Sequence, residues 1–415
     1  MIRIEHSSNP LNYGTNMMVT NFMYYLDKFS GKNNTYELDV FNDQDLNRYK
    51  NQYLEGKINR KTIDYGLTYS ENIFQKANNK LKRKLAFDYF HNKKINELIK
   101  NTESLVILGG DDLSEYYGVD NLKREFHRLE KVKNKINLFL VGQTIGPFSY
   151  ERIDLAQKTL NNLLIYSRDP WTTKYLKEKL YIDNAIDSRD LALIPLPYQE
   201  NKNIEEKILK RYKLEKHNYI TLVPSGLYES YCKNIDLYIE NWVNIIKYLR
   251  KNIPNKEIVL LPHVLRYEIY DDRNIIRKLE NIFKNDNKIK FIYDEMMPLQ
   301  ARFILGNGVF TITGRMHGAI STLQMRKPAI SLSYSVKYNG VIGEGLNLKS
   351  LIVDGKGDNL WINKNVANDV AKKIDYVMGN YSKIIKDIDY NVSECEIKVF
   401  NMIKEISKQI NLNSI

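Results

Sequence analysis

The sequence predicts an α/β fold in which two doubly wound, Rossmann-like domains face a central cleft. Short segments rich in β-forming residues alternate with longer helical patterns along most of the chain, as in βαβ units that form parallel sheets. The length of 415 residues exceeds that of a usual single domain, and a polar stretch at residues 198–218 divides two series of the same kind. We therefore expect an N-terminal domain over residues 1–200 and a C-terminal domain over residues 201–415.

The first series consists of apolar, β-branched segments separated by helical patterns. Its predicted strands are residues 2–6, 37–41, 105–108, 136–141 and 163–167. The clearest predicted helices of this half are residues 150–162 and 172–180. Parallel strands in such a sheet place their carboxyl ends along one edge.

The second series repeats this alternation. Its predicted strands are residues 219–223, 257–261, 289–293, 309–313 and 329–333. Long helical patterns near residues 364–378 and 393–410 end the chain. We expect these last helices to pack back on the first domain.

The composition excludes several classes of protein. A hydrophobic fraction of 43% and a charged fraction of 27% are those of a folded chain rather than of a disordered or fibrous one. Cys232 and Cys395 stand far apart and are the only cysteines, so neither a disulfide framework nor a zinc module is expected. The N-terminus has no signal-peptide pattern, and the apolar runs are too short to span a membrane. We expect a cytoplasmic protein.

The chain is basic, with 62 Lys and Arg against 50 Asp and Glu and a net charge of +12. A basic surface attracts nucleic acid or another anionic polymer. However, the basic run at residues 80–84 is short, and the basic stretch at residues 123–135 mixes with acids and aliphatic residues at helical spacing, which indicates a solvated helix face. We therefore expect no nucleic-acid partner.

Ligands of doubly wound sheets bind beyond the carboxyl ends of the strands, so the residues that follow each strand are candidates for a site. Gly109 and Gly110 follow one predicted strand, and glycines there permit a tight turn and a close approach of the backbone to a ligand. Asp111 and Asp112 come next and either orient a hydroxyl group or cap the following helix. Arg168 follows another strand and either meets an anion in the cleft or pairs with its aspartate neighbour.

The strongest local pattern is an apolar strand that runs into Gly314, Arg315, Met316 and His317 and then into a helix. A helix N-terminus offers N–H donors and the positive end of the helix dipole, which favour a phosphate or a carboxylate. Arg315 adds a planar fork that matches either group, and His317 can act as a general acid or base near neutral pH. The alternative is that His317 is a packed helix residue whose ring has structural partners.

The region around this pattern lacks acidic residues. No Asp or Glu stands between Glu295 and Glu344, although the span contains the cations Arg302, Arg315, Arg326, Lys327 and Lys337. Because retained cations need anionic partners, we interpret the span as an anion-binding wall. The alternative is that buried strands use up the positions that acids would take.

His263 also follows a predicted strand, and it either contacts a ligand or hydrogen-bonds its own loop. The histidines show no metal-binding spacing, so no metal site is expected.

Taken in order along the chain, a set of short motifs resembles the polysaccharide pyruvyl transferase family. The motif residues are Asn12, Gly14, Asn16, Gly109, Gly110, Asp111, Asp112, Gln143, Gly146, Arg168, His263, Gly314, Arg315, Met316, His317, Tyr334 and Lys337. The resemblance covers most of the chain, and it implies a fold similar to that of the GT-B glycosyltransferases.

The resemblance also implies an enzyme that moves a pyruvyl group from phosphoenolpyruvate to sugar hydroxyls, commonly as a cyclic ketal, during synthesis of bacterial capsule, exopolysaccharide or cell-wall glycan. It implies that Arg168 and Arg315 hold the phosphate and carboxylate of the donor, that His317 is the acid/base, and that Lys337 is a further donor-side cation. The remaining motif residues are expected to bind substrate. Phosphoenolpyruvate is the donor substrate, and no cofactor is implied. The acceptor is a sugar; whether it is lipid-linked, which would bring the enzyme to the inner membrane face, stays open.

Thr15 and Asp111 depart from the family pattern, which often has an aspartate and a glycine at these positions. If the usual aspartate orients the acceptor or the donor in the family, this chain, which has Thr15 at that position, leaves open what replaces it. An alternative function is that of a GT-B glycosyltransferase with a nucleotide-sugar donor, although the acid-free span lacks the glutamate that many retaining enzymes of that class use. A second alternative is a non-catalytic protein that binds an anionic polymer. The basic charge and the 30 tyrosines would suit such a protein.

Overall fold

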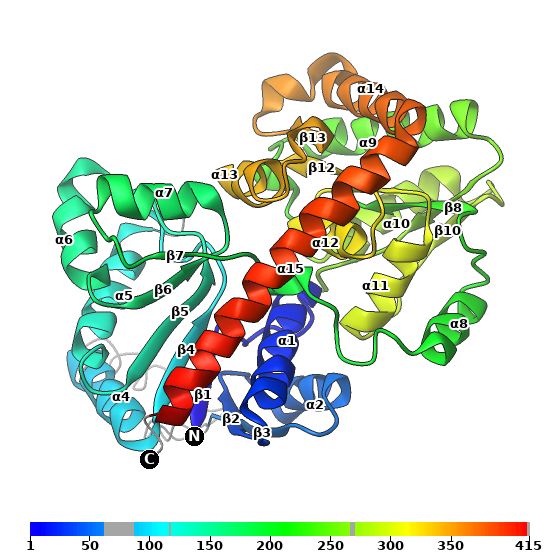
Figure 1. The fold of residues 1–415 in the computed structure, drawn as a ribbon. Coiled ribbons are helices and arrows are strands. Elements are labelled where there is room, and N and C mark those ends of the chain that lie inside the picture. Colours follow the sequence, from blue (N-terminus) through cyan, green and yellow to red (C-terminus); the bar gives the residue numbers. More distant parts are fainter. Residues whose placement is uncertain (62–86, 116–117, 266–269, 413–415) are drawn as a thin grey trace, which may run out of the picture.

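Two parallel β-sheets form the two halves of the computed structural model, which describes residues 1–61, 87–115, 118–265 and 270–412 (Figure 1). The seven-stranded sheet has the order β3-β2-β1-β4-β5-β6-β7, and the six-stranded sheet has the order β10-β9-β8-β11-β12-β13. Every strand pairing in both sheets is parallel. The doubly wound sheets that the sequence predicts are therefore present. The basic run at residues 80–84 lies outside the described residues.

Helices alternate with the strands of the first sheet. Its strands are β1 (Ile2–Glu5), β2 (Thr35–Leu38), β3 (Lys57–Arg60), β4 (Ser104–Leu108), β5 (Asn137–Gln143), β6 (Leu164–Ser167) and β7 (Ile186–Asp187). Its helices are α1 (Tyr13–Ser30), α2 (Asp43–Gln52), α4 (Phe87–Asn101), α5 (Val119–Val132), α6 (Tyr150–Leu160) and α7 (Pro170–Lys179).

The second half follows the same plan. Its strands are β8 (Tyr219–Val223), β9 (Glu257–Leu260), β10 (Ile289–Phe291), β11 (Thr311–Thr313), β12 (Ala329–Ser333) and β13 (Ile352–Asp354). Its helices are α8 (Lys202–Arg211), α9 (Ile235–Asn252), α10 (Asp272–Phe283), α11 (Pro298–Asn307), α12 (Met316–Gln324), α13 (Val336–Tyr338), α14 (Asn365–Gly379) and α15 (Tyr381–Leu412).

The sequence patterns miss or misplace several short elements. The strands β3, β7 and β13 lie outside the predicted ones, and β7 is only two residues long, too short for a periodic pattern. The strand β2 ends at Leu38 rather than at residue 41. Its chain leaves the sheet there because the carboxylate of Asp39 accepts hydrogen bonds from the backbone N–H groups of His6 and Ser7, at 3.3 and 2.8 Å.

The polar stretch between the two series contains the helix α8, which the sequence analysis does not predict. Ile208 and Leu209 of α8 are buried, whereas most of its charged residues face solvent. An amphipathic helix with so few apolar residues is hard to distinguish from a polar linker by composition.

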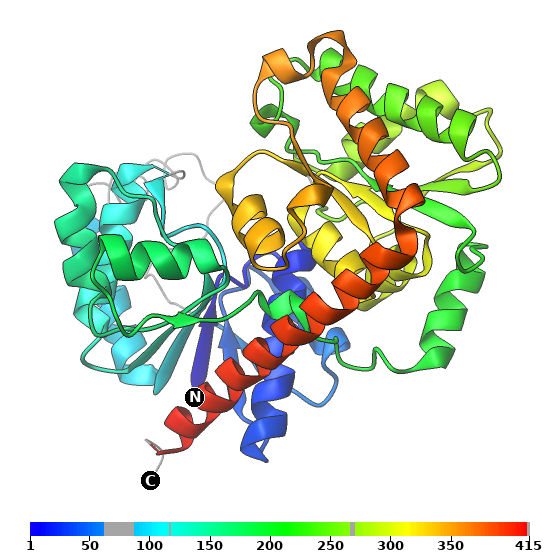
Figure 2. The ribbon, with the colours of Figure 1, turned by 45° about the horizontal axis from the view of Figure 1, so that its top comes forward.

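Two helices join the halves. Helix α1 contacts α15, α11 and α12, and the long helix α15 runs from the second half back alongside α1 (Figures 1 and 2). One hydrophobic cluster contains Val106 of the first sheet and Leu222 and Ile312 of the second. The halves therefore share a core, which fixes the strand ends of one sheet relative to those of the other.

None of the helices in the described part of the chain combines the length and the apolar character needed to cross a membrane.

Candidate active site

A cavity of about 640 Å³ lies between the two halves, beyond the carboxyl ends of strands from both sheets. The motif residues that line it from the first half are Asn12, Gly109, Gly110, Asp111, Asp112 and Arg168. Those that line it from the second half are His263, Arg315, Met316, His317, Tyr334 and Lys337. Motifs that lie far apart in the sequence therefore meet at one place.

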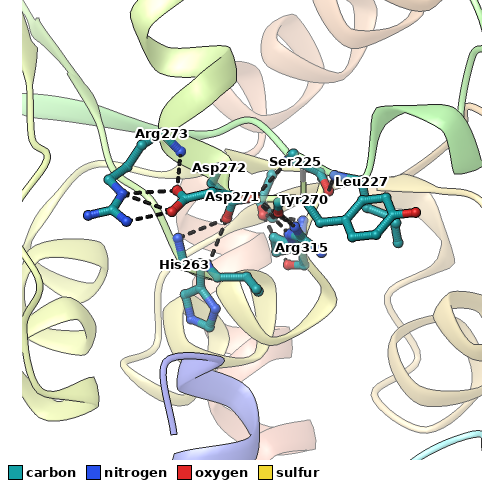
Figure 3. Close-up of polar contacts among 12 residues, drawn as sticks. Ser225, Leu227, His263, Tyr270, Asp271, Asp272, Arg273 and Arg315 are labelled. Atoms are coloured by element: carbon teal, nitrogen blue, oxygen red, sulfur yellow. Dashed lines mark hydrogen bonds and ion pairs between the residues drawn. The ribbon is translucent and has the colours of Figure 1, made fainter. Parts of the chain in front are cut away.

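Arg315 is held by a buried carboxylate (Figure 3). It stands at the N-cap of α12, and its Nε and Nη2 donate hydrogen bonds to Oδ1 of Asp272 at 3.0 and 2.7 Å. Burial by itself would lower the pKa of Arg315, but Asp272 more than offsets this, and the pKa lies above its ordinary value. Among the described residues Nη1 has no partner, so it is left for a ligand.

Asp272 also fixes two loops of the cavity. Its side chain is fully buried, its Oδ1 accepts a hydrogen bond from Gly226 N–H at 2.7 Å, and its Oδ2 accepts from His263 and Val264 N–H at 3.0 and 2.8 Å. These backbone donors share the negative charge of the carboxylate. Arg315 can therefore attract a second anion while it stays in place.

His263 lies in one of these loops, with its ring buried beneath the cavity. The ring contacts Tyr13 edge-on, with 5.5 Å between the ring centroids, and neither ring nitrogen has a hydrogen-bond partner in the described part of the chain. Burial is the main cause that lowers the pKa of His263 far below its ordinary value, and the charges of His317 and Arg315 lower it further. The ring is therefore neutral, and its two nitrogens are buried without a partner in the described part of the chain.

A second buried carboxylate connects the two halves. Oδ2 of Asp190 lies 3.4 Å from Nη1 of Arg168 and 3.3 Å from Nε2 of His317. Burial by itself would raise the pKa of Asp190, but His317 and then Arg168 lower it to about 2. Asp190 is therefore ionised, and it accepts a hydrogen bond from a proton on Nε2 of His317.

Arg168 is anchored in the same manner as Arg315. Its Nε donates a hydrogen bond to Oγ1 of Thr144 at 2.7 Å, and its Nη1 faces Asp190. No described residue pairs with its Nη2. Both arginines thus have one side fixed by protein and one nitrogen left for an anion in the cavity.

The chain between the two sheets determines where Asp190 lies. Oδ1 of Asp190 accepts a hydrogen bond from Ala192 N–H at 2.9 Å and so begins the helical turn Leu191–Leu193. The buried Arg302 of α11 donates to the carbonyls of Ala192 and Ile194 at 2.7 and 3.0 Å. Arg302 therefore holds the connection between the halves rather than a ligand.

Gly14 and His317 are in close contact. A Cβ atom at position 14 would collide with Nδ1 and Cγ of the His317 ring. Gly14 itself does not line the cavity. The motif that contains Gly14 predicts that this residue binds substrate, whereas the structure places it behind the histidine, where only a residue without a side chain fits.

Lys337 and Asp111 face each other across the cavity. Nζ of Lys337 lies 3.4 Å from Oδ2 of Asp111 and donates a hydrogen bond to the hydroxyl of Tyr334 at 2.9 Å. Asp111 follows β4 of the first sheet, and Lys337 follows β12 of the second. This ion pair is a direct contact between the two walls of the cavity.

Asn16 and Gln143 are motif residues that do not line the cavity. The side-chain amide of Asn16 donates to the carbonyl of Pro10 at 3.3 Å, and that of Gln143 donates to the carbonyl of Leu108 at 2.7 Å. Both side chains are buried and fix the backbone of loops that do reach the cavity.

Gly146 and Gly314 also lie outside the lining. A Cβ at Gly146 would collide with the ring of Tyr175, away from the cavity. The carbonyl of Gly314 accepts a hydrogen bond from the hydroxyl of Tyr338 at 3.0 Å. These glycines therefore serve packing and loop geometry.

Only some of the cations in the acid-free span, which the sequence predicts to form an anion-binding wall, reach the cavity. Arg315 and Lys337 line the cavity, whereas Arg302, Arg326 and Lys327 do not. Arg302 is bound to carbonyl oxygens, and Arg326 forms ion pairs with two acids of α15, at 2.9 and 3.1 Å. A cation that is close to site residues in the sequence can pair with acids of a distant helix, and a local sequence pattern does not reveal such a pair.

The cavity also contains residues that sequence reasoning did not select as site residues. Among them are His6, Ser8, Asn9, Tyr270 and Tyr338. His6 ends a predicted strand, so the rule that selected the other strand ends would have found it. Asp190 follows β7, whose two residues give no strand signal, and the sequence therefore contained no comparable indication for it.

The arrangement combines three cations with a histidine that a carboxylate orients, which is suited to binding a small anion and moving a proton. In residues 1–61, 87–115, 118–265 and 270–412, no group of three His, Cys, Asp or Glu side chains is placed to hold a metal ion.

Solved structures of other proteins have a similar fold. UDP-GlcNAc 2-epimerase from Neisseria meningitidis, in a structure with UDP-GlcNAc, aligns with a TM-score of 0.60 at 10% identity, over 98% of this chain and 99% of its own. MnaA from S. aureus, in a structure with UDP, aligns with a TM-score of 0.59 at 10% identity, over 99% of this chain and 96% of its own. At this identity the likeness concerns the fold alone, and it confirms the GT-B-like architecture.

Sequence comparisons identify the family. The polysaccharide pyruvyl transferase family matches residues 32–336. The amylovoran biosynthesis protein AmsJ from Erwinia amylovora is 20% identical over 335 residues, which are 75% of this chain and 74% of AmsJ. The family match spans most of the chain, and the matched residues include the cavity residues Arg168, Arg315 and His317. The chain therefore belongs to the polysaccharide pyruvyl transferase family and is a transferase.

Proposed function

We propose that the protein transfers the pyruvyl group of phosphoenolpyruvate to sugar hydroxyl groups, as a ketal, during synthesis of a bacterial capsule, exopolysaccharide or cell-wall glycan. The observation that carries the proposal is the convergence of Arg168, Arg315 and Lys337 on one cavity that also contains His317. Phosphoenolpyruvate presents a phosphate and a carboxylate close together, and guanidinium groups match both in geometry and charge. Membership of the family supports this choice of donor.

The buried carboxylates leave the arginines able to bind this donor. Asp272 and Asp190 each occupy one side of an arginine, and each also accepts hydrogen bonds from backbone N–H groups. The site is thus preorganised, with Nη1 of Arg315 and Nη2 of Arg168 left for the donor. Groups fixed in this way stabilise charge without reorganising during the reaction.

His317 would supply the proton that activates the donor. Protonation of the methylene carbon of phosphoenolpyruvate builds positive charge on the neighbouring carbon, which the oxygen of a sugar hydroxyl then attacks. Asp190 accepts a hydrogen bond from Nε2 of His317 and so orients the ring, and a histidine in a fixed position can act as a general acid. The arginines would hold the phosphate as it leaves.

The wall of the cavity that belongs to the first half would receive the sugar. Gly109 and Gly110 give the backbone close access to a ligand, and Asp112 and Asn9 are polar side chains that can contact hydroxyl groups. Phosphoenolpyruvate is a cytoplasmic metabolite, which supports a cytoplasmic site of action.

Thermal unfolding in the presence of donor candidates tests the proposal. Phosphoenolpyruvate at 100 times its Kd should stabilise the protein by about 2.7 kcal/mol, and Arg315→Ala should lose the shift. Arg326→Ala, which removes an arginine outside the cavity, is the matched control and should keep it. His317→Ala should also keep the shift and lose turnover.

A shift with UDP-GlcNAc or another nucleotide sugar, and none with phosphoenolpyruvate, would contradict the proposal. That result would instead identify a glycosyltransferase that retains the family's fold with a different donor.

A further inference from the structure

The proposed reaction needs a group that removes the proton of the acceptor hydroxyl, whereas His317 gives its proton to the donor. The cavity-lining side chains that can take up a proton are His6, His263, His317, Asp111 and Asp112. We propose that His6 is the general base that activates the acceptor hydroxyl. This inference rests on the proposed function, whose donor and acid it takes as given.

His6 lies at the right place for a residue that contacts the acceptor. It directly follows β1, which pairs with β2 on one side and β4 on the other, and it lines, from the first half, the same cavity that Arg315 and His317 line from the second. Its side chain is partly exposed. Its backbone N–H donates to Oδ2 of Asp39 at 3.3 Å, which fixes the residue at the end of the strand.

The contacts of the His6 ring determine its tautomer. Nδ1 lies 3.1 Å from the carbonyl oxygen of Leu108 and 3.4 Å from Oδ2 of Asp112. A carbonyl oxygen and an ionised carboxylate only accept hydrogen bonds, so Nδ1 carries the proton and the lone pair of the neutral ring is on Nε2. In the described part of the chain Nε2 has no hydrogen-bond partner. The carboxylate of Asp112 would stabilise the imidazolium that forms when Nε2 takes up a proton.

The other candidates are less suited to this role. His317 is bonded to Asp190 and acts on the donor. His263 is buried, and its lowered pKa makes it a weak base. Asp111 pairs with Lys337 at 3.4 Å.

Asp112 is the last of the alternatives. A carboxylate is ordinarily a weaker base than an imidazole near neutral pH, and this carboxylate contacts Nδ1 of His6. It is therefore placed to assist His6 rather than to replace it.

In the first step the acceptor oxygen forms a bond to the central carbon of the donor. The electron pair of the carbon–carbon double bond takes the proton of His317, and Nε2 of His6 takes the proton of the hydroxyl. The bond from the central carbon to the phosphate oxygen then breaks, and phosphate leaves with that electron pair. When a second hydroxyl closes the ketal, its proton returns to neutral His317, and the proton on His6 leaves with phosphate or water. No oxidation or reduction occurs.

Chemical rescue of His6→Gly tests this role. The backbone φ of His6 is 64°, a value that glycine adopts without strain, so the variant should fold and leave a space that added imidazole can enter. The assay measures phosphate release from phosphoenolpyruvate with p-nitrophenyl β-D-glucoside, galactoside and mannoside as acceptors. We expect turnover to fall by about 10²- to 10⁴-fold and to recover as imidazole is added, with the thermal shift by phosphoenolpyruvate unchanged.

His217→Gly is the matched control. His217 also has a left-handed backbone, with φ 61°, but it does not line the cavity. Its variant should keep the wild-type rate and show no response to imidazole.

A rate of His6→Gly within threefold of wild type overturns the inference, as does a loss that imidazole does not restore. If phosphoenolpyruvate does not stabilise the wild-type protein and the protein releases no phosphate from it, the proposed function is overturned. The role of His6 is then overturned with it. The two failures are therefore distinguishable.

Discussion

The two walls of the cavity hold their charged side chains with very different rigidity. On the wall of the second half, Asp272 is fully buried and binds Arg315 and the backbone of two loops (Figure 3). On the wall of the first half, the side chain of Asp112 is 52% exposed and contacts His6 at 3.4 Å. One carboxylate is part of the core, and the other is largely in solvent.

This difference matches the two substrates of the proposed reaction. A small donor has one shape, so a wall fixed by buried hydrogen bonds can be complementary to it. An acceptor glycan is larger and can adopt several conformations, so the wall that receives it can have side chains that move in solvent.

Removal of Asp272 should have the largest effect. Asp272→Ala leaves the buried Arg315 without its carboxylate and two loops without their acceptor, which should cost about 3–5 kcal/mol. Hydrogen exchange of the amides of Gly226, His263 and Val264 should rise sharply, because these amides donate to the lost carboxylate.

Asp112→Ala is the matched control from the other wall, and its exposed carboxylate should contribute no more than about 0.5 kcal/mol to stability. Equal destabilisation of the two variants would show that the walls do not differ in rigidity.

A methyl group behind His317 should have the next largest effect. In Gly14→Ala the new Cβ collides with Nδ1 and Cγ of the ring, so the ring must leave the position in which Nε2 bonds to Asp190. We expect kcat to fall about 100-fold, equivalent to roughly 2.7 kcal/mol, while phosphoenolpyruvate still stabilises the protein, because Arg168 and Arg315 are not displaced.

The control for this variant is Gly379→Ala, where a Cβ would have no atom within 4 Å. A Gly14→Ala variant with the wild-type rate would mean that the ring position imposed by α1 is not needed for the reaction.

The sequence was informative where a site residue follows a detectable strand. Arg315 and His317 follow β11, and Arg168 follows β6, so the rule that ligands bind at strand ends led to them directly. The same rule would have reached His6 at the end of β1. The two sheets could be predicted for a related reason, because their buried central strands are short apolar runs between helical patterns.

The buried carboxylates could not be predicted in their roles. Asp272 begins a helix and Asp190 begins a helical turn, and in the sequence each is indistinguishable from an ordinary capping residue. Their function depends on an arginine that is 43 and 22 residues away, respectively. Such pairs are set by tertiary packing, as is the contact between Gly14 and His317, and local patterns do not contain that information.

The smallest predicted effect concerns the pH dependence of Asp190, the carboxylate that both walls share. His317 and Arg168 lower its pKa in the folded protein to about 2, so its stabilising contribution is complete above the ordinary carboxyl pKa near 4 and is lost as the pH falls through about 2. The contribution should be roughly 2 kcal/mol at neutral pH. Asp190→Asn should therefore lower the melting temperature at pH 6, and the difference from wild type should shrink between pH 4 and pH 2. Asp183→Asn, which alters an exposed carboxyl group of the same half, is the control. A difference that stays constant over this range would mean that Asp190 acts by shape and not by charge, and that its contacts with Arg168 and His317 do not stabilise the protein as ionic ones.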